Sequence, residues 1–228
     1  MKTERTKRYQ AGLLLLVGIL PQLLNGFYNP LIVGNKALFW AVDVLTLTLL
    51  PLCIYILGLK LRAFNNQDIG LRQGINSNQN MTLIAFYSLV MALVVYFGYQ
   101  IFAGIGYLLA DMFSSVPEEM LFDFSMALKG EGVSHVFLVL YLSVTAGLVE
   151  EFYYRGLFRR VFPEGVNGDI LFVLMSSLLF GIVHWEGGFI KVFATFWLGS
   201  VLAASYLRIK NLWPFIIGHA IADFVFFI

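Results

Sequence analysis

The chain has 228 residues, of which 59% are hydrophobic and only 13% are charged. A soluble domain needs roughly a quarter of its residues charged, so this composition excludes a soluble protein and predicts one that lies in a lipid bilayer. The net charge of +1 offers no basic face for nucleic acid. Because a spanning helix takes about 20 residues, seven spans leave no room for a soluble domain, and we expect residues 1–228 to form one integral-membrane domain.

Seven apolar runs are long enough, or nearly so, to cross a membrane as helices, which predicts an all-α, polytopic bundle of about seven transmembrane helices. They lie at about residues 11–24, 37–59, 81–110, 134–162, 170–184, 189–207 and 212–228. The first run can continue to Val33. The third contains three glycines and leaves three outcomes open: one long helix, a kinked helix, or a helix followed by a re-entrant turn.

Basic residues mark alternate connections, and Lys and Arg accumulate on the cytoplasmic side of a membrane. This predicts a cytoplasmic N-terminus and an outer C-terminus in the cell membrane. The basic positions are the tail before the first run, Lys60 with Arg62 and Arg72, Arg159 with Arg160, and Arg208 with Lys210. The acidic stretch from residue 111 to 131 is then an outer loop, with amphipathic helical character expected over 112–128. A single cysteine, Cys53, excludes a disulfide framework and a cysteine-based metal cluster.

A few ionisable residues lie inside the apolar runs. Placing each of them in the membrane costs at least about 2.5–3.5 kcal/mol, so each is expected to have a specific structural or functional role. They are Asp43, Glu150, Glu151, Arg155, His184, His219 and Asp223. We expect Asp43 to face the bundle and bond a Thr or Tyr hydroxyl. The other six fall in the last 80 residues.

Glu151 and Arg155 are four residues apart, so on a helix they share a face and can form an ion pair. Glu150 points about 100° away and is left for another role. Either the two glutamates and the arginine form a buried packing network, or Glu150 acts as a general base. The same spacing puts His219 and Asp223 on one face, where Asp223 can orient the imidazole, accept its proton or join it on a metal.

The depths of these groups allow them to meet. Counted at about 1.5 Å per residue from the predicted cytoplasmic ends, Glu150 lies roughly 18 Å deep, His184 about 21 Å and His219 about 10 Å. We therefore expect a single cavity, open toward the cytoplasm, that holds Glu150, His184, His219 and Asp223.

Three motifs, in order on the fourth, fifth and seventh runs, resemble those of the CPBP intramembrane proteases, which include CAAX prenyl endopeptidases of the Rce1 type and bacterial relatives linked to bacteriocin self-immunity. The motifs are Glu150-Glu151-x-x-x-Arg155, Phe180-x-x-x-His184 and His219-x-x-x-Asp223. The resemblance covers about residues 134–228, which are expected to be the catalytic helices, so the active site is placed within the last four helices.

The resemblance implies peptide-bond hydrolysis within the bilayer. Glu150 would be the general base and His184 would help to hold and deprotonate a water, while His219 and Asp223 would stabilise the oxyanion. Glu151 and Arg155 would be the scaffold, supported by Phe180. An ionised Asp223 cannot donate to an oxyanion, so it must be protonated, act through His219, or bind a metal. A metal-free Glu/His mechanism is favoured; with zinc or another divalent metal, the ligands would be Glu150, His184, His219 and Asp223.

Three classes of function remain to be separated. The leading one is an endopeptidase whose partners are the bilayer and a peptide or membrane-anchored protein substrate. The second is a non-enzymatic bacteriocin-immunity or peptide-binding protein of the same fold. The third, a transporter or proton relay, is disfavoured because paired repeats and matching broken helices are not evident.

Overall fold

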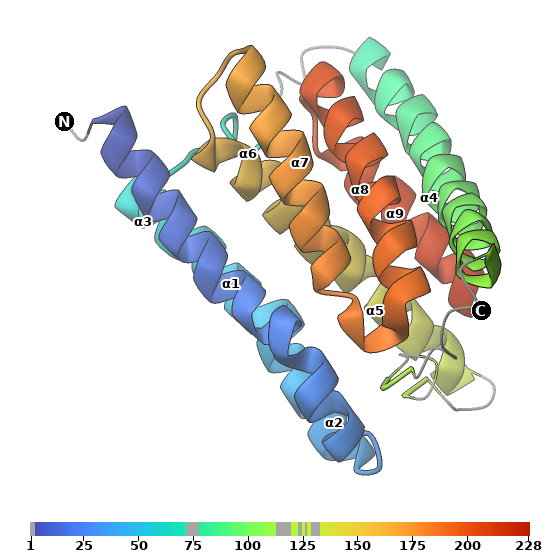
Figure 1. Ribbon diagram of the computed structural model, residues 1–228. Helices are drawn as coiled ribbons and strands as arrows, with labels where there is room; N and C mark the ends of the chain where they lie inside the picture. Colours follow the sequence, from blue (N-terminus) through green and yellow to red (C-terminus); the bar gives the residue numbers. More distant parts are fainter. Residues whose placement is uncertain (1–2, 72–77, 113–119, 123–124, 126, 129–132) are drawn as a thin grey trace.

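The computed structural model describes residues 3–71, 78–112, 120–122, 125, 127–128 and 133–228, without the side chains of 78–80 and 133. Within these ranges the chain forms seven helical spans and is all-α (Figure 1). The first is α1 (Glu4–Ile32), and the second joins α2 (Lys36–Asp43), the π-helical segment η1 (Val44–Leu49) and α3 (Leu50–Leu61). The others are α4 (Asn78–Met112), α5 (Val133–Glu151) with the π-helical η3 (Phe152–Leu157) and α6 (Phe158–Val161), α7 (Val166–Ile182), the 3-10 turn η4 (Trp185–Gly187) with α8 (Gly188–Ile209), and α9 (Trp213–Phe227).

The lengths and composition of these spans make the chain a multi-pass membrane protein. Five spans are long and apolar enough to cross a bilayer, while α7 and α9 are shorter apolar helices. Large apolar side chains such as Leu31, Phe86 and Ile101 point outward, as they do when lipid is the solvent. The predicted all-α bundle of about seven helices is therefore confirmed.

The open question on the third apolar run is answered by α4, which is one helix of 35 residues. The first helix reaches Ile32, well beyond residue 24, with Pro21 and Pro30 inside it. Most of the predicted amphipathic stretch at 112–128 lies outside the described residues.

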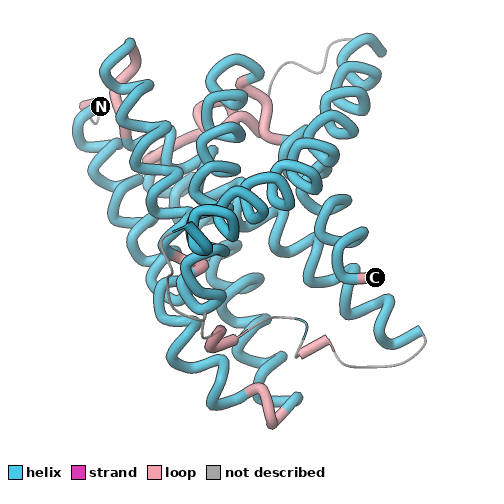
Figure 2. Tube along the Cα trace, turned by 45° about the vertical axis from the view of Figure 1, so that its right-hand side comes forward, coloured by secondary structure: helices cyan, strands magenta, loops and turns pink. Residues whose placement is uncertain are grey.

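The helices form two groups that meet around α5. The span made of α2, η1 and α3 runs beside α1, while α7, α8, α9 and α4 stand together on the other side (Figures 1 and 2). Close helix contacts position α9 from both sides. A Cβ added at Gly218 would lie 2.8 Å from the backbone nitrogen of Ala92 on α4, and one at Gly147 on α5 would lie 2.8 Å from the carbonyl oxygen of Ile216. These glycines let α9 pack directly against α4 and α5.

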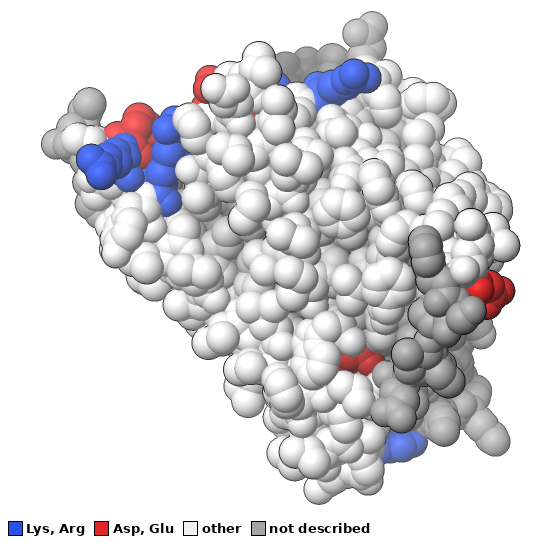
Figure 3. Space-filling model, viewed as in Figure 1, with Lys and Arg blue, Asp and Glu red and all other residues white. Residues whose placement is uncertain are grey.

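The four basic connections lie at one end of the bundle. Arg160 reaches Glu4 at 2.8 Å and Asp68 at 3.6 Å, and the backbone nitrogen of Leu212 donates to the carbonyl of Gly70 at 2.9 Å. On the face drawn in Figure 3, most of the visible Lys and Arg side chains gather at this end. The charge asymmetry on which the predicted orientation depends is thus present in three dimensions.

Candidate active site

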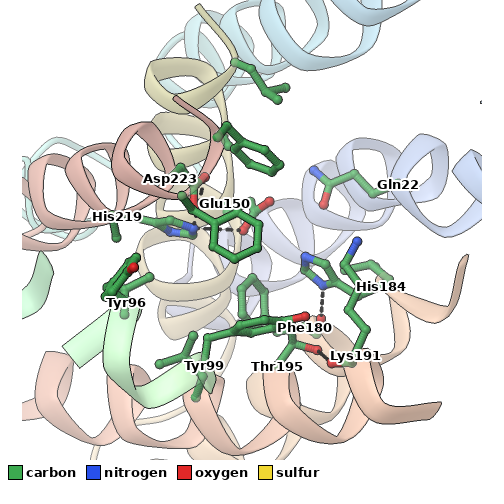
Figure 4. A pocket seen from close by; sticks show the side chains of 18 of the residues that line it. Gln22, Tyr96, Tyr99, Glu150, Phe180, His184, Lys191, Thr195, His219 and Asp223 are labelled. Atoms are coloured by element: carbon green, nitrogen blue, oxygen red, sulfur yellow. Dashed lines mark hydrogen bonds and ion pairs between the residues drawn. The ribbon is translucent and has the colours of Figure 1, made fainter. Parts of the chain in front are cut away.

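A cavity of about 200 Å³ lies inside the bundle and is lined by Glu150, His184, His219 and Asp223. Glu150 comes from the end of α5, His184 follows α7, and His219 and Asp223 lie on one face of α9 (Figure 4). The structure therefore brings together, in one cavity, all four residues that the motifs single out. Helix α8 adds Lys191 and Thr195 to the lining.

The His219 ring lies among three carboxyl groups. Its Nδ1 donates to Oε1 of Glu151 at 2.8 Å, while its Nε2 lies 3.6 Å from Oε2 of Glu150 and 3.7 Å from Oδ2 of Asp223. The bond to Glu151 fixes the orientation of the ring and leaves Nε2 facing the cavity. Glu150 and Asp223 are each 22% exposed and flank that nitrogen.

Glu151 and Arg155 form the predicted ion pair, at 3.3 Å between Oε1 and Nη1, and both side chains are fully buried. The Arg155 guanidinium also lies 4.5 Å from the centre of the Phe180 ring, a cation–π contact that joins η3 to α7. The π-helical segment η3 begins immediately after Glu151, and such wide turns often occur at functional sites. Glu151 and Arg155 are thus part of the frame around the cavity, whereas Glu150 faces it.

His184 is held in a defined tautomer. Its Nδ1 lies 2.7 Å from the backbone carbonyl oxygen of Phe180, and the ring packs edge-on against the Phe180 ring at 5.0 Å. Because a carbonyl oxygen only accepts, Nδ1 must carry the proton. In the neutral ring Nε2 is then an acceptor that can receive a hydrogen bond from water.

A zinc or other divalent metal in this cavity would be held by Glu150, His184, His219 and Asp223. Within the described part of the chain, no three His, Cys, Asp or Glu side chains converge closely enough to hold a metal ion. The His219 Nδ1 is engaged by Glu151 and the His184 Nδ1 by Phe180, so each ring could bind a ligand in the cavity only through its Nε2.

The cavity also has polar walls that the sequence motifs did not indicate. Gln22 and Asn25 of α1 and Tyr96 and Tyr99 of α4 line it (Figure 4). A signal for the α1 pair was present, because Gln22, Asn25 and Asn29 recur at helical spacing in an otherwise apolar run. Glu186, two residues after His184, also lines the cavity, whereas the Trp185 indole nitrogen donates to the Leu23 carbonyl of α1.

Comparison with known protein families finds a match in the C-terminal part of the chain. No curated protein and no solved structure matches the chain. Residues 132–225, which run from the start of α5 into α9, match the family model described as "Type II CAAX prenyl endopeptidase Rce1-like". That span contains all three motifs, and a domain of this family implies an intramembrane protease. The C-terminal part of the chain is therefore an Rce1-like domain, and the resemblance to the CPBP family is confirmed over these residues.

Proposed function

We propose that this protein is an intramembrane endopeptidase in which Glu150 and His184 activate a water for attack on a peptide bond. The observation that carries the proposal is that two hydrogen-bond acceptors line the same cavity. One is the Glu150 carboxylate, which is free of the Glu151–Arg155 pair, and the other is the His184 Nε2, whose lone pair is set by the bond from Nδ1 to Phe180.

In this mechanism, water donates one hydrogen to Glu150 and the other toward His184 Nε2. Glu150 takes the proton as the water oxygen bonds to the carbonyl carbon, and the tetrahedral oxyanion accepts a hydrogen bond from the Nε2–H of a protonated His219. When the C–N bond breaks, Glu150 returns its proton to the leaving amine. Asp223, 3.7 Å from the His219 Nε2, acts through that ring. No step of this mechanism uses a metal.

We propose a peptide or a segment of a membrane-anchored protein as the substrate. The cavity carries aromatic side chains beside the polar cluster, from Tyr96 and Tyr99 on α4 and from Phe226 and Phe227 at the end of α9. Such a lining suits an apolar stretch of chain held next to the reacting carbonyl. The 134–228 segment would be the catalytic part of a single integral-membrane domain.

The test is cleavage by the purified full chain in lipid nanodiscs, using quenched peptides and membrane-anchored candidate substrates. Glu150→Gln keeps the shape and removes the base, so the rate should fall by about 10²–10⁴-fold, and His184→Ala should also be severely impaired. Glu164→Gln, an exposed position outside the cavity, is the matched control and should cleave normally. Full cleavage by both site variants would overturn the assignment. Peptide binding or toxin protection that survives Glu150→Gln without cleavage would favour the non-enzymatic class.

The route by which substrate reaches the cavity is a separate proposal. The sequence predicts an opening toward the cytoplasm, while the lining also extends to Glu186 on η4 and Lys191 in the first turn of α8, at the end of the bundle opposite the basic connections. Single cysteines at positions 36 and 164, in a Cys53→Ser background, report which face each end occupies. An N-terminus-inside orientation requires labelling at 36 from outside and at 164 only from inside.

A further inference from the structure

A second, smaller cavity of about 30 Å³ lies between α1 and the start of η1. Asp43, Thr46 and Leu47 form one side, and Gln22, Asn25 and Tyr28 are among the α1 residues on the other. Gln22, Asn25 and Leu47 also line the large cavity. The small cavity, which we call the side chamber, therefore shares a wall with the candidate active site (Figure 4 shows Gln22 on that wall).

Three buried polar atoms of residues that line the side chamber have no hydrogen-bond partner among the described residues. They are Nε2 of Gln22, Oδ1 of Asn25 and Oδ2 of Asp43. Each belongs to a side chain that has a polar side chain as a neighbour. Gln22 Oε1 accepts from the Tyr154 hydroxyl at 2.7 Å, Asn25 lies beside Glu186, and Asp43 lies beside Tyr141. Asp43 is only 5% exposed, so its second oxygen is turned away from any outer solvent.

The unpartnered atoms include both a hydrogen-bond donor and hydrogen-bond acceptors, and this combination indicates the class of ligand. Gln22 Nε2 is a donor that needs an acceptor, whereas Asn25 Oδ1 and Asp43 Oδ2 are acceptors that need donors. A cation would satisfy the two oxygens and leave the amide donor unmatched, while water both donates and accepts. A buried water occupies about 10–15 Å³ on this measure of volume, so the side chamber has room for about two.

We propose that the side chamber binds ordered water and supplies it to the active site, with Asp43 as the anchor. This rests on the proposed hydrolase function, because each peptide bond cleaved consumes one water in a site surrounded by lipid. Asp43 is a positioning residue in this proposal, since it lines only the side chamber. Its place at the end of α2, where the π-helical η1 begins, fits the tendency of π-helical turns to occur at functional sites.

The first arm of the test is a structure of the full chain at a resolution that shows water. We expect density bonded to Asp43 Oδ2 and to Gln22 Nε2 or Asn25 Oδ1, and loss of that density in Asp43→Leu. A dry chamber, or density with the short contacts of a cation, would overturn the proposal. This arm does not depend on proteolysis, so it separates failure of the water site from failure of the proposed function.

The second arm is kinetic. Asp43→Leu should lower kcat by about tenfold with KM unchanged, because losing ordered water affects the chemical step and leaves substrate contacts intact. If Asp43→Leu does not fold, Thr46→Val replaces it and should lower kcat by about twofold to tenfold. Thr145→Val is its matched control, since both threonines donate to the carbonyl four residues earlier and Thr145 lines neither cavity. An unchanged kcat in the folded chamber variant would overturn the supply role.

Discussion

The Nδ1 of His219 on α9 lies 2.8 Å from Oε1 of Glu151 on α5, and the same oxygen lies 3.3 Å from Nη1 of Arg155. One buried carboxylate oxygen therefore holds both the arginine that packs over Phe180 and the histidine that faces the cavity. The Glu151 carboxylate therefore has two roles: it neutralises the buried Arg155, which stabilises the bundle, and it orients the His219 ring. Substitutions can separate the effect on stability from the effect on catalysis.

Glu151→Gln should destabilise the protein strongly. The variant keeps an acceptor for His219 but removes the negative charge beside a fully buried Arg155, and an uncompensated buried charge costs about 3–5 kcal/mol. Thermal or denaturant unfolding in a defined detergent measures the change. Asp169→Asn, which breaks the partly exposed pair with Arg159, is the control and should cost under about 1 kcal/mol. Equal losses in the two variants would contradict the buried-pair interpretation.

The double variant Glu151→Gln with Arg155→Met should recover most of that stability and still cleave poorly. An apolar side chain of similar size removes the unpaired charge, and replacing a whole buried pair is often neutral or stabilising. The His219 ring, however, would still face a neutral amide in place of a carboxylate. Unfolding and cleavage assays on the same preparations check both parts. Activity that returns together with stability would show that Glu151 is only structural.

Much of the fold could be predicted from the sequence because lipid imposes simple requirements on length and polarity. The sequence left open whether the third run is one helix and whether the first run continues beyond residue 24. Both depend on how the helices pack, and the structure has one helix in each case. The wide turns at Val44–Leu49 and Phe152–Leu157 were not predicted, since apolar periodicity does not distinguish a π-helical turn from an α-helical one.

The C-terminal half of the candidate site was predictable because ionised groups in lipid are costly and stand out in the sequence. The α1 wall was harder to predict, since Gln22 and Asn25 are uncharged and lie beside Tyr154 and Glu186, which are far away in sequence. Asp43 does face the bundle, as expected, and lies beside Tyr141. The unpartnered Asp43 oxygen and the side chamber could not be predicted, because they depend on the contact between α1 and η1.

The tautomer of His184 can be read directly by nitrogen NMR. The bond from Nδ1 to the Phe180 carbonyl predicts a protonated Nδ1 and an unprotonated Nε2 in the neutral ring. Protein labelled with 15N-histidine in nanodiscs should show this pattern, assigned by the signals that disappear in His184→Ala. A protonated Nε2 with a bare Nδ1 would contradict the proposed role of His184 as an acceptor for water.

Gly218→Ala should reduce both stability and activity, because α9 touches α4 at this residue. The added Cβ would lie 2.5 Å from the Met91 Cβ and 2.8 Å from the backbone of Ala92, and the backbone of α4 cannot move without shifting the helix. Overpacking of this kind costs about 1–3 kcal/mol, and a displacement of about 1 Å at the adjacent His219 can reduce the rate by about 10²-fold.

Gly104→Ala, where an added Cβ would meet no described atom within 4 Å, is the matched control on α4. It should leave cleavage unchanged and stabilise the helix by about 0.5–1 kcal/mol. Equal behaviour of the two variants in unfolding and cleavage assays would show that the close approach of α9 to α4 does not position the site.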